Sequence, residues 1–406
     1  MRRVAWGLLL LFAFAIPWEY SLDLGEPLGN VARVVGLLLL LAAVPAVLQA
    51  GSMRTPGALQ WMVLAFYLWF CCTYFWTIEP VVTLERMRAN FQVMMTVWLV
   101  WEFAESPQDL RVLLRAFVAG SCVLAVLTLA NFASPQTIAE GQVRFAAIGQ
   151  DPNDVARFLD IGFPLAAFLL NSEPRWPARL LALGYMPLGL IAVLLTASRG
   201  GFLAAVVALG GCGILLARSH AKGVLVVAVA LPAIAAALWF TVPHEIFERL
   251  ATIPEQLQSG DLNQRMNIWT AGWHAFVQAP LLGSGAGSFV SVAGTAPMDT
   301  AHNTALAIAV NGGLLGLFLA VAIVVLAARS ILQTHGALRL ALTMALLVWV
   351  ITAMVATVEE SRTTWLLLAL IALAGRLALE QPERLAACFP DSAPATACSE
   401  VPAPAV

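Results

Sequence analysis

Charged residues are scarce in this chain: Asp, Glu, Lys and Arg make up 11% of its 406 residues, whereas soluble domains contain roughly 25%. So few charges cannot cover the surface of a water-soluble protein of this length. The net charge is only −2 and no basic stripe is visible, so nucleic-acid binding is not indicated. Hydrophobic residues make up 60% of the chain and place it in a lipid bilayer.

The sequence also lacks a Walker A motif, a dinucleotide-binding fingerprint, and outer His and carboxylate residues at metal-ligand spacing. Asp151 and Asp154 lie close together, as do Glu359 and Glu360, but two acids without further ligands make a poor metal site. The cysteines lie in predicted spans or in the C-terminal tail, so no disulfide framework is indicated. We therefore expect neither a metal nor a cofactor.

Long apolar runs recur along the chain. Each is close to or above the ~17 residues that cross a bilayer as a helix, and helices can be arrayed there without unpaired backbone groups. They predict an all-α polytopic membrane protein with about 12 transmembrane helices. The first run resembles a secretion signal but lacks a cleavage site, so we treat it as retained. The predicted spans are residues 4–19, 31–50, 58–77, 90–104, 111–131, 153–170, 179–196, 201–217, 223–241, 302–328, 340–356 and 363–379.

Lys and Arg residues in the connections orient the chain, because they favour the cytoplasmic side. With the N-terminus inside, 13 of the 22 fall on the cytoplasmic side and nine outside. The orientation rule gives no reason for the outer nine, so they require another explanation. These are Arg33, Arg86, Arg88, Arg144, Arg157, Arg199, Arg249, Arg265 and Arg362.

One connection is too long for a simple loop and predicts a small helical periplasmic domain. Within it, Met266, Trp269, Trp273 and Phe276 recur at helical spacing. This amphipathic helix packs on the core or forms a lipid-facing lid. The expected organisation is 1–241 with the first nine spans, 242–301 as the periplasmic domain, 302–380 with the last three spans, and 381–406 as a disordered cytoplasmic tail.

Two outer arginines are candidates for anion binding. Arg199 lies in a very short turn between two spans, where a charge near hydrocarbon is costly unless it has a use. Arg265 begins the amphipathic helix and is a candidate for the other half of a clamp, since a guanidinium grips phosphate oxygens in a bidentate fork. The alternatives are an interfacial anchor for Arg199 and a solvated surface residue for Arg265.

His302 is the candidate base. It lies at the outer mouth of the tenth span, where Asp299 or Thr300 is expected to cap the helix. The positive helix end disfavours imidazolium, and a neutral imidazole can accept a proton from a hydroxyl. The alternative is a histidine that merely finishes the cap.

Further polar residues on the same face are candidates for a sugar or polyanion path. Arg144 and Asn153 lie close together in the sequence, and Asn303 follows His302. Arg86 and Arg88 have an alternative explanation, because they can pair with Glu79 and Glu85. The expected substrate-binding set is Arg86, Arg88, Arg144, Asn153 and Asn303.

Taken together, these motifs resemble the O-antigen ligase and polymerase superfamily. The resemblance extends over most of the chain through its spans and outer segment. It implies a fold like that of GT-C glycosyltransferases. Its specific part comprises Ser198-Arg-Gly-Gly201, Arg265-Met-Asn-Ile-Trp269, Gly283-Ser-Gly-Ala-Gly287, His302-Asn303 and Asn311-Gly-Gly313.

The resemblance also implies a reaction. A ligase of this family passes O-antigen from undecaprenyl pyrophosphate to lipid A-core at the periplasmic face of the bacterial inner membrane. Carried onto this chain, Arg199 and Arg265 would neutralise the pyrophosphate and His302 would activate the acceptor hydroxyl. The family implies a metal-independent, inverting transfer by a multi-pass protein in contact with membrane lipid.

Other functions stay open at this stage. An O-antigen polymerase or a protein O-oligosaccharyltransferase of the same superfamily would share these residues. A lipid-linked-sugar transporter or a non-enzymatic scaffold would also need many spans, although a transporter is expected to place charges at mid-membrane. Asp160 is the charge in this sequence that lies there.

Overall fold

The computed structural model describes residues 1–26, 28–134, 144–219, 239, 241–259, 265–296 and 300–390. Over these residues the regular structure is helical, and an isolated bridge between Asp23 and Asn30 is the one β contact. The elements are α1 (Arg2–Ala15), η1 (Ile16–Ser21), α2 (Val31–Ala50), α3 (Ala58–Cys72), η2 (Thr73–Phe75), α4 (Pro80–Phe103), α5 (Pro107–Ala133), α6 (Pro152–Ser172), α7 (Trp176–Leu195), α8 (Arg199–Ser219), α10 (His244–Ala251), α11 (Ile253–Ser259), α12 (Arg265–Gln278), α13 (Phe289–Ala293), α14 (Thr304–Gln333), α15 (Gly336–Ala353), α16 (Arg362–Glu380) and α17 (Pro382–Cys388).

Ten helices in the described part of the chain are long and apolar enough to cross a membrane. The prediction of an all-α polytopic membrane protein is therefore confirmed. Two of the expected spans are not among the ten. The span at 90–104 lies in α4, which begins ten residues earlier and carries Glu85, Arg86, Arg88 and Glu102, and the span at 223–241 falls almost entirely outside the described residues.

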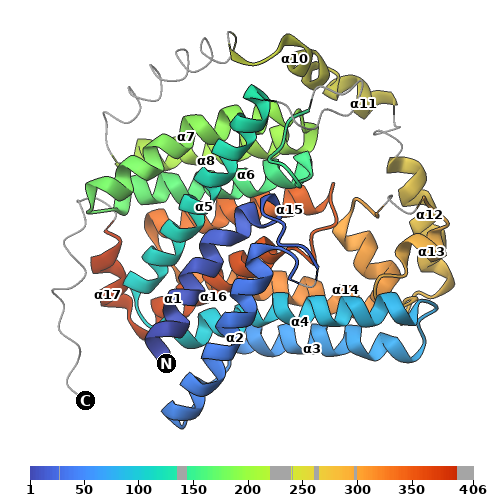
Figure 1. Ribbon diagram of the computed structural model, residues 1–406, viewed down its shortest axis with the longest axis horizontal. Coiled ribbons are helices and arrows are strands. Elements are labelled where there is room, and N and C mark those ends of the chain that lie inside the picture. The colour runs from blue at the N-terminus through green and yellow to red at the C-terminus, as the bar shows by residue number, and fades with distance from the viewer. Residues whose placement is uncertain are drawn as a thin grey trace.

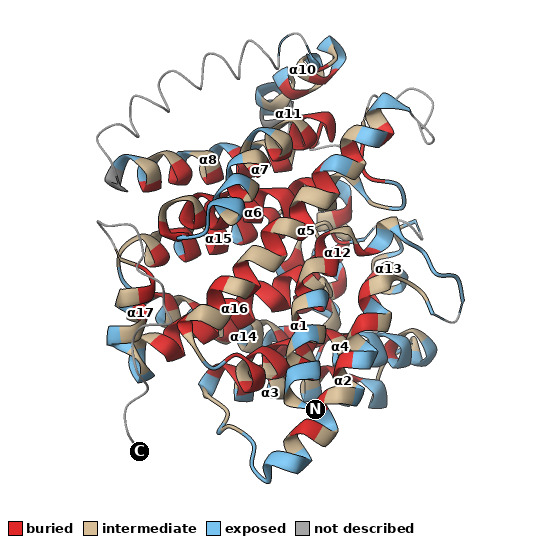
Figure 2. Cartoon of the chain, turned by 60° about the vertical axis from the view of Figure 1, so that its left-hand side comes forward, coloured by how far each residue is buried: buried red, intermediate tan, exposed pale blue. Residues whose placement is uncertain are grey.

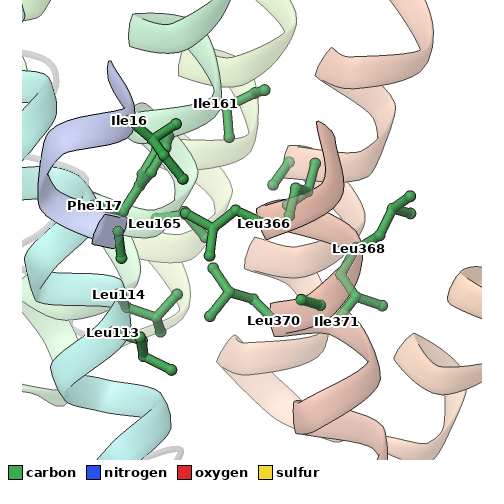
Figure 3. Packing of buried hydrophobic residues seen from close by; sticks show 14 of the residues in the cluster. Ile16, Leu113, Leu114, Phe117, Ile161, Leu165, Leu366, Leu368, Leu370 and Ile371 are labelled. Atoms are coloured by element: carbon green, nitrogen blue, oxygen red, sulfur yellow. The ribbon is translucent and has the colours of Figure 1, made fainter. Parts of the chain in front are cut away.

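Two helices form the centre of the bundle. In α6 and α16, 89% and 83% of the most apolar window is buried, against 28% in α2 and 22% in α14. Both central helices are mostly red in Figure 2. Leu165 of α6 and Leu366 of α16 point toward one another in Figure 3 and belong to the same buried cluster. The outer helices instead expose leucines, as expected where a helix faces lipid.

Local sequence signals start the helices that carry the site. Ser106 caps α5 by accepting a hydrogen bond from Asp109 N–H, with Pro107 in the first turn. Asp151 caps α6 by accepting from Asn153 N–H at 2.7 Å, again with a proline in the first turn. These caps fix where α6 begins, and so fix the polar residues of its first turns.

Successive helices alternate in direction, which gives the bundle two ends. We call the end where α2, α4, α6, α8, α14 and α16 begin the α6 end, and the end where α1, α3, α5, α7 and α15 begin the α1 end. Figure 1 shows α10 to α13 along the upper and right-hand edge, and α17 at the left-hand side. Arg199 of α8 contacts Arg249 and Thr252, which places α10 at the α6 end.

The glycine-rich turn after α12 meets a kink in α14. Ser284 N–H donates to the Val310 carbonyl and Gly285 N–H to the Asn311 carbonyl, both at 2.9 Å. Gly283 and Gly313 both have positive φ, and a Cβ on Gly313 would lie 2.2 Å from the Leu281 carbonyl oxygen. The backbone of the glycine-rich turn therefore lies close against the backbone of α14.

The face that α12 turns to the core differs from expectation. Ile268, Gly272 and Ala275 are its buried residues, while Met266 and Trp273 are exposed. The interpretation of Met266 and Trp273 as core residues is therefore wrong. The physical reason is that Gly272 permits close approach: a Cβ there would meet the ring of Phe289 at 2.8 Å.

Candidate active site

The turn between α7 and α8 is held by a hydrogen-bond network. Ala197 has φ of 48° and is fully buried, so the turn is strained as well as enclosed. Ser198 Oγ donates to Asn153 Oδ1 at 2.8 Å, and Arg144 Nη2 donates to the same oxygen at 2.9 Å. Arg144 Nε also donates to the Thr196 carbonyl at 3.1 Å. Asn153 thus joins the start of α6 to the turn that presents Arg199.

Arg199 is the first residue of α8 and contacts the segment after α10. Its Nη2 donates to Thr252 Oγ1 at 2.6 Å and its Nε to the Arg249 carbonyl at 3.3 Å. Arg249 Nε in turn donates to the Ala197 carbonyl at 3.2 Å. The two arginines therefore hold α8 and α10 together through neutral acceptors.

Four guanidinium groups act on one another here. Burial is the largest cause that lowers the pKa of Arg144, Arg249 and Arg265, and the charge of Arg199 lowers the pKa of all three further. Asp151 opposes this effect on Arg144 and Arg265. In the described part of the chain none of the four is ion-paired with a carboxylate. We call Arg144, Arg199, Arg249 and Arg265 the arginine cluster.

The arginine cluster is suited to a polyanion. Like charges held together in a partly buried site repel one another, and a bound phosphate or diphosphate would relieve that repulsion. The N-terminus of α8 adds the positive end of the helix dipole. The structure brings Arg199 and Arg265 within electrostatic range of each other.

His302 lies directly before the cap of α14. Its φ is 45°, an uncommon conformation for a residue with a side chain. The cap is Asn303, whose Oδ1 accepts from Leu306 N–H at 3.0 Å and whose Nδ2 donates to the Met354 carbonyl at 3.3 Å. The prediction that Asp299 or Thr300 caps this helix is therefore wrong for Thr300, and Asp299 lies outside the described residues.

An ion pair lies in the first turns of α6. Arg157 Nη2 lies 2.9 Å from Asp154 Oδ1. Arg157 is almost completely buried, whereas the Asp154 side chain is 39% exposed. An accessible carboxylate is therefore held by a buried arginine at the α6 end.

The two arginines of α4 differ from each other. Arg86 forms an ion pair with Glu360, in the loop between α15 and α16. The suggested pairing of Arg86 with Glu79 or Glu85 is wrong, and Glu79 Oε1 instead accepts from Ser291 Oγ at 2.8 Å. Arg88 is exposed, with no ion pair to another described residue. Substrate binding by either arginine stays a prediction.

Sequence reasoning missed three residues of this region as candidates. Arg249 and Arg157 were only two of the nine outer arginines, and Asp154 was considered only as half of a metal site. The signal for Asp154 and Arg157 was their i, i+3 spacing on a predicted helix, which brings opposite charges together. In the part of the chain that the structure describes, no three His, Cys, Asp or Glu side chains are grouped so as to hold a metal.

Comparison with known proteins agrees with the resemblance noted in the sequence. Residues 184–321 match the model of the O-antigen ligase family. The matched segment includes Arg199, Arg249, Arg265 and His302. The match covers about a third of this multi-pass membrane protein and shows similarity to that family over those residues. None of the curated proteins compared with the chain matches it.

Proposed function

From the match to O-antigen ligases, we propose that this protein transfers O-antigen from undecaprenyl pyrophosphate to the lipid A-core oligosaccharide. The observation that carries the proposal is the arginine cluster, four mutually repelling guanidiniums with no carboxylate ion pair in the described chain. A lipid diphosphate supplies the negative charge that this cluster lacks. The active face would be the α6 end, which the charge count assigns to the periplasmic side of the bacterial inner membrane.

The reaction we propose is one direct displacement. An acceptor hydroxyl oxygen attacks the anomeric carbon, and the bond from that carbon to the diphosphate oxygen breaks. The diphosphate leaves with the bonding electron pair, and its added charge is stabilised by Arg199 and Arg265. The hydroxyl proton passes to the imidazole of His302. Attack opposite to the leaving group inverts the anomeric centre, and the residues named perform the reaction without a metal.

The test uses the full-length purified protein with undecaprenyl-pyrophosphate-linked O-antigen as donor and lipid A-core as acceptor, with chelator present. Wild-type protein is expected to lengthen the lipid A-core, and His302→Ala to lose at least about 100-fold in rate. His274→Ala is the matched control, because His274 is an exposed histidine on α12. It is expected to transfer at the wild-type rate.

Each other outcome contradicts a different part of the proposal. If the donor glycan lengthens while lipid A-core stays bare, the protein is a polymerase and the ligase proposal fails. Transfer that stops on chelation overturns metal independence. Near-normal transfer by His302→Ala removes the proposed base.

A further inference from the structure

The hydroxyl of Thr252 is a polar group at the α6 end that the displacement above leaves unused. It lies between α10 and α11, within hydrogen-bond distance of Arg199. We propose that Thr252 is a positioning residue for Arg199: its hydroxyl holds one edge of the guanidinium and so directs the remaining N–H groups toward the diphosphate of the donor. This inference rests on the proposed function, because that function supplies the diphosphate.

The Thr252 hydroxyl has a single proton, and the structure shows which atom receives it. Thr252 Oγ1 donates to the Arg249 carbonyl at 2.7 Å. Its lone pairs are therefore left to accept, and Arg199 Nη2 donates to them at 2.6 Å. The Arg249 carbonyl also accepts from Arg199 Nε, at 3.3 Å. One hydroxyl and one carbonyl thus hold Arg199 together.

These two bonds use one edge of the Arg199 guanidinium. The group is planar, and Nε and Nη2 lie along the same side of it. The other donors are Nη1 and the second hydrogen of Nη2, which form a fork at the end of the side chain. Among the described residues no acceptor is bonded to Nη1. A fork of this shape matches two oxygens of a phosphate group.

The position of Thr252 is fixed independently of its bond to Arg199. Apolar side chains of α10 are buried against the turn between α7 and α8, in a cluster that contains Leu195, Ala197, Ile246 and Leu250. Arg249 Nε donates to the Ala197 carbonyl at 3.2 Å and joins the same two segments. The hydroxyl is therefore a fixed acceptor for a long side chain, and α10 stays attached to the turn when the hydroxyl is removed.

A side chain that is held in advance binds its ligand more tightly than a free one. An unrestrained arginine must give up rotamer freedom when it grips a phosphate, whereas a restrained one has already lost it. Removal of the Thr252 hydroxyl should therefore weaken diphosphate binding through Arg199 and leave the fold in place.

The first test compares Thr252→Val, which keeps the shape of the side chain without its hydroxyl, with Thr252→Ser, which keeps the hydroxyl. The measurement is the Kd of undecaprenyl pyrophosphate for the purified full-length protein in detergent. Thr252→Val is expected to bind about 10-fold more weakly than wild type, because a hydrogen bond to a charged group contributes about that factor or more. Thr252→Ser should stay close to wild type. Equal affinity of Thr252→Val and wild type overturns the inference.

Thr343→Val is the matched control. The Thr343 hydroxyl donates to the carbonyl of Arg339 on the preceding turn at 2.8 Å, much as the Thr252 hydroxyl donates to that of Arg249. Among the described residues no arginine donates to Thr343 in return. Thr343→Val should bind with wild-type affinity. A loss equal to that of Thr252→Val would show a general effect of removing such a hydroxyl and would contradict the inference.

A double variant separates positioning from a structural role. If Thr252 acts through Arg199, then adding Thr252→Val to Arg199→Ala should weaken binding no further. The remaining arginines of the cluster are expected to keep this binding measurable. A further 10-fold loss in the double variant would mean that the hydroxyl acts elsewhere, and the inference would be wrong. If Thr252→Val does not fold, Thr252→Ala replaces it in both measurements, with the same outcomes.

Transfer to lipid A-core, measured with the same variants, separates this inference from the proposed function. Thr252→Val is expected to lower kcat by about 10-fold or more and to leave the KM of the acceptor unchanged. If the diphosphate binds in a manner that depends on Thr252 but wild-type protein transfers nothing, the proposed function fails and the inference stands. If wild-type protein transfers and Thr252→Val binds and transfers equally well, only the inference fails. Failure of wild-type protein to bind the diphosphate overturns both.

Discussion

Arginines lie at both ends of the helix bundle, but in opposite surroundings. At the α1 end, Arg115 Nη2 donates to Glu173 Oε1 at 2.6 Å, and Glu173 is fully buried. Arg376 donates to the Trp101 carbonyl at 2.7 Å, and its guanidinium lies 4.7 Å from the Trp101 ring. Each of these guanidiniums donates hydrogen bonds to the protein itself, and that of Arg115 is paired with a carboxylate.

At the α6 end, no described carboxylate forms an ion pair with the arginine cluster. Arg199 donates to a hydroxyl and a carbonyl, and its charge lowers the pKa of Arg144, Arg249 and Arg265. Buried charges are normally paired, and an unpaired group of like charge is costly in a folded protein. Other arginines of the α6 end, Arg86, Arg157 and Arg362, are paired with carboxylates. The comparison therefore sets the arginine cluster apart from the remaining arginines, and we infer that the cluster is held in place for a ligand.

The largest expected effect is on catalysis by the arginine cluster. Arg199→Ala should lower transfer by about 1,000-fold, because one donor aimed at a developing charge is worth about 10²–10³ in rate. The melting temperature should change little, since its contacts are to neutral acceptors. The measurements are initial transfer rate and thermal unfolding in detergent. If the melting temperature falls while the folded fraction transfers at the normal rate, Arg199 stabilises the fold as Arg115 does, and the proposed difference between the two ends is wrong.

The opposite pattern is expected at the α1 end. Arg115→Ala leaves the buried carboxylate of Glu173 without its partner, which should cost about 3 kcal/mol of folding free energy. Transfer per folded molecule should stay near wild type. Denaturant unfolding measures the loss of folding free energy, and the transfer rate per folded molecule measures the activity. The double variant Arg115→Ala, Glu173→Gln should recover stability, and failure to do so would show that the pair is not what Arg115 contributes.

Much of this contrast was open to prediction from sequence. Apolar runs predicted the membrane helices, since their length and composition alone decide whether they cross a bilayer. Arg199 and His302 stood out because charge or a titratable ring is unusual beside a span, and Arg265 stood out because it begins the amphipathic helix and can complete a clamp with Arg199. These residues can be identified as candidates from the sequence without knowing their partners.

The pairings were not predictable in the same way. Arg86 pairs with Glu360 and Arg362 pairs with Glu19, and in each pair the partners are far apart in the chain. Only helix packing brings them together. The buried face of α12 was misassigned for a related reason. Spacing identifies apolar residues, but α12 packs on the face that carries Gly272 because a glycine allows close approach.

The smallest expected effect concerns a carboxyl group at the α6 end that costs stability. Burial, with the charge of Glu360 adding to it, raises the pKa of Glu359 to about 8, while Arg86 and Arg157 act against the rise. Glu359 Oε2 has no hydrogen-bond partner among the described residues. Between its ordinary pKa and about 8, the folded protein keeps a proton that the unfolded chain has lost. The penalty on folding therefore grows as pH rises through that window.

Glu359→Gln removes that penalty while keeping the shape of the side chain. It should raise the melting temperature by about 2 °C at pH 8 and by less at pH 5. At pH 5 the carboxyl group of Glu359 is closer to fully protonated in both the folded and the unfolded wild-type chain. Glu85→Gln, an exposed acid on α4, is the control and should change nothing at either pH. An equal gain at both pH values would mean that packing, not ionisation, causes the effect. A gain confined to high pH would show that ionisation of the buried carboxyl group of Glu359 lowers the stability of the folded protein.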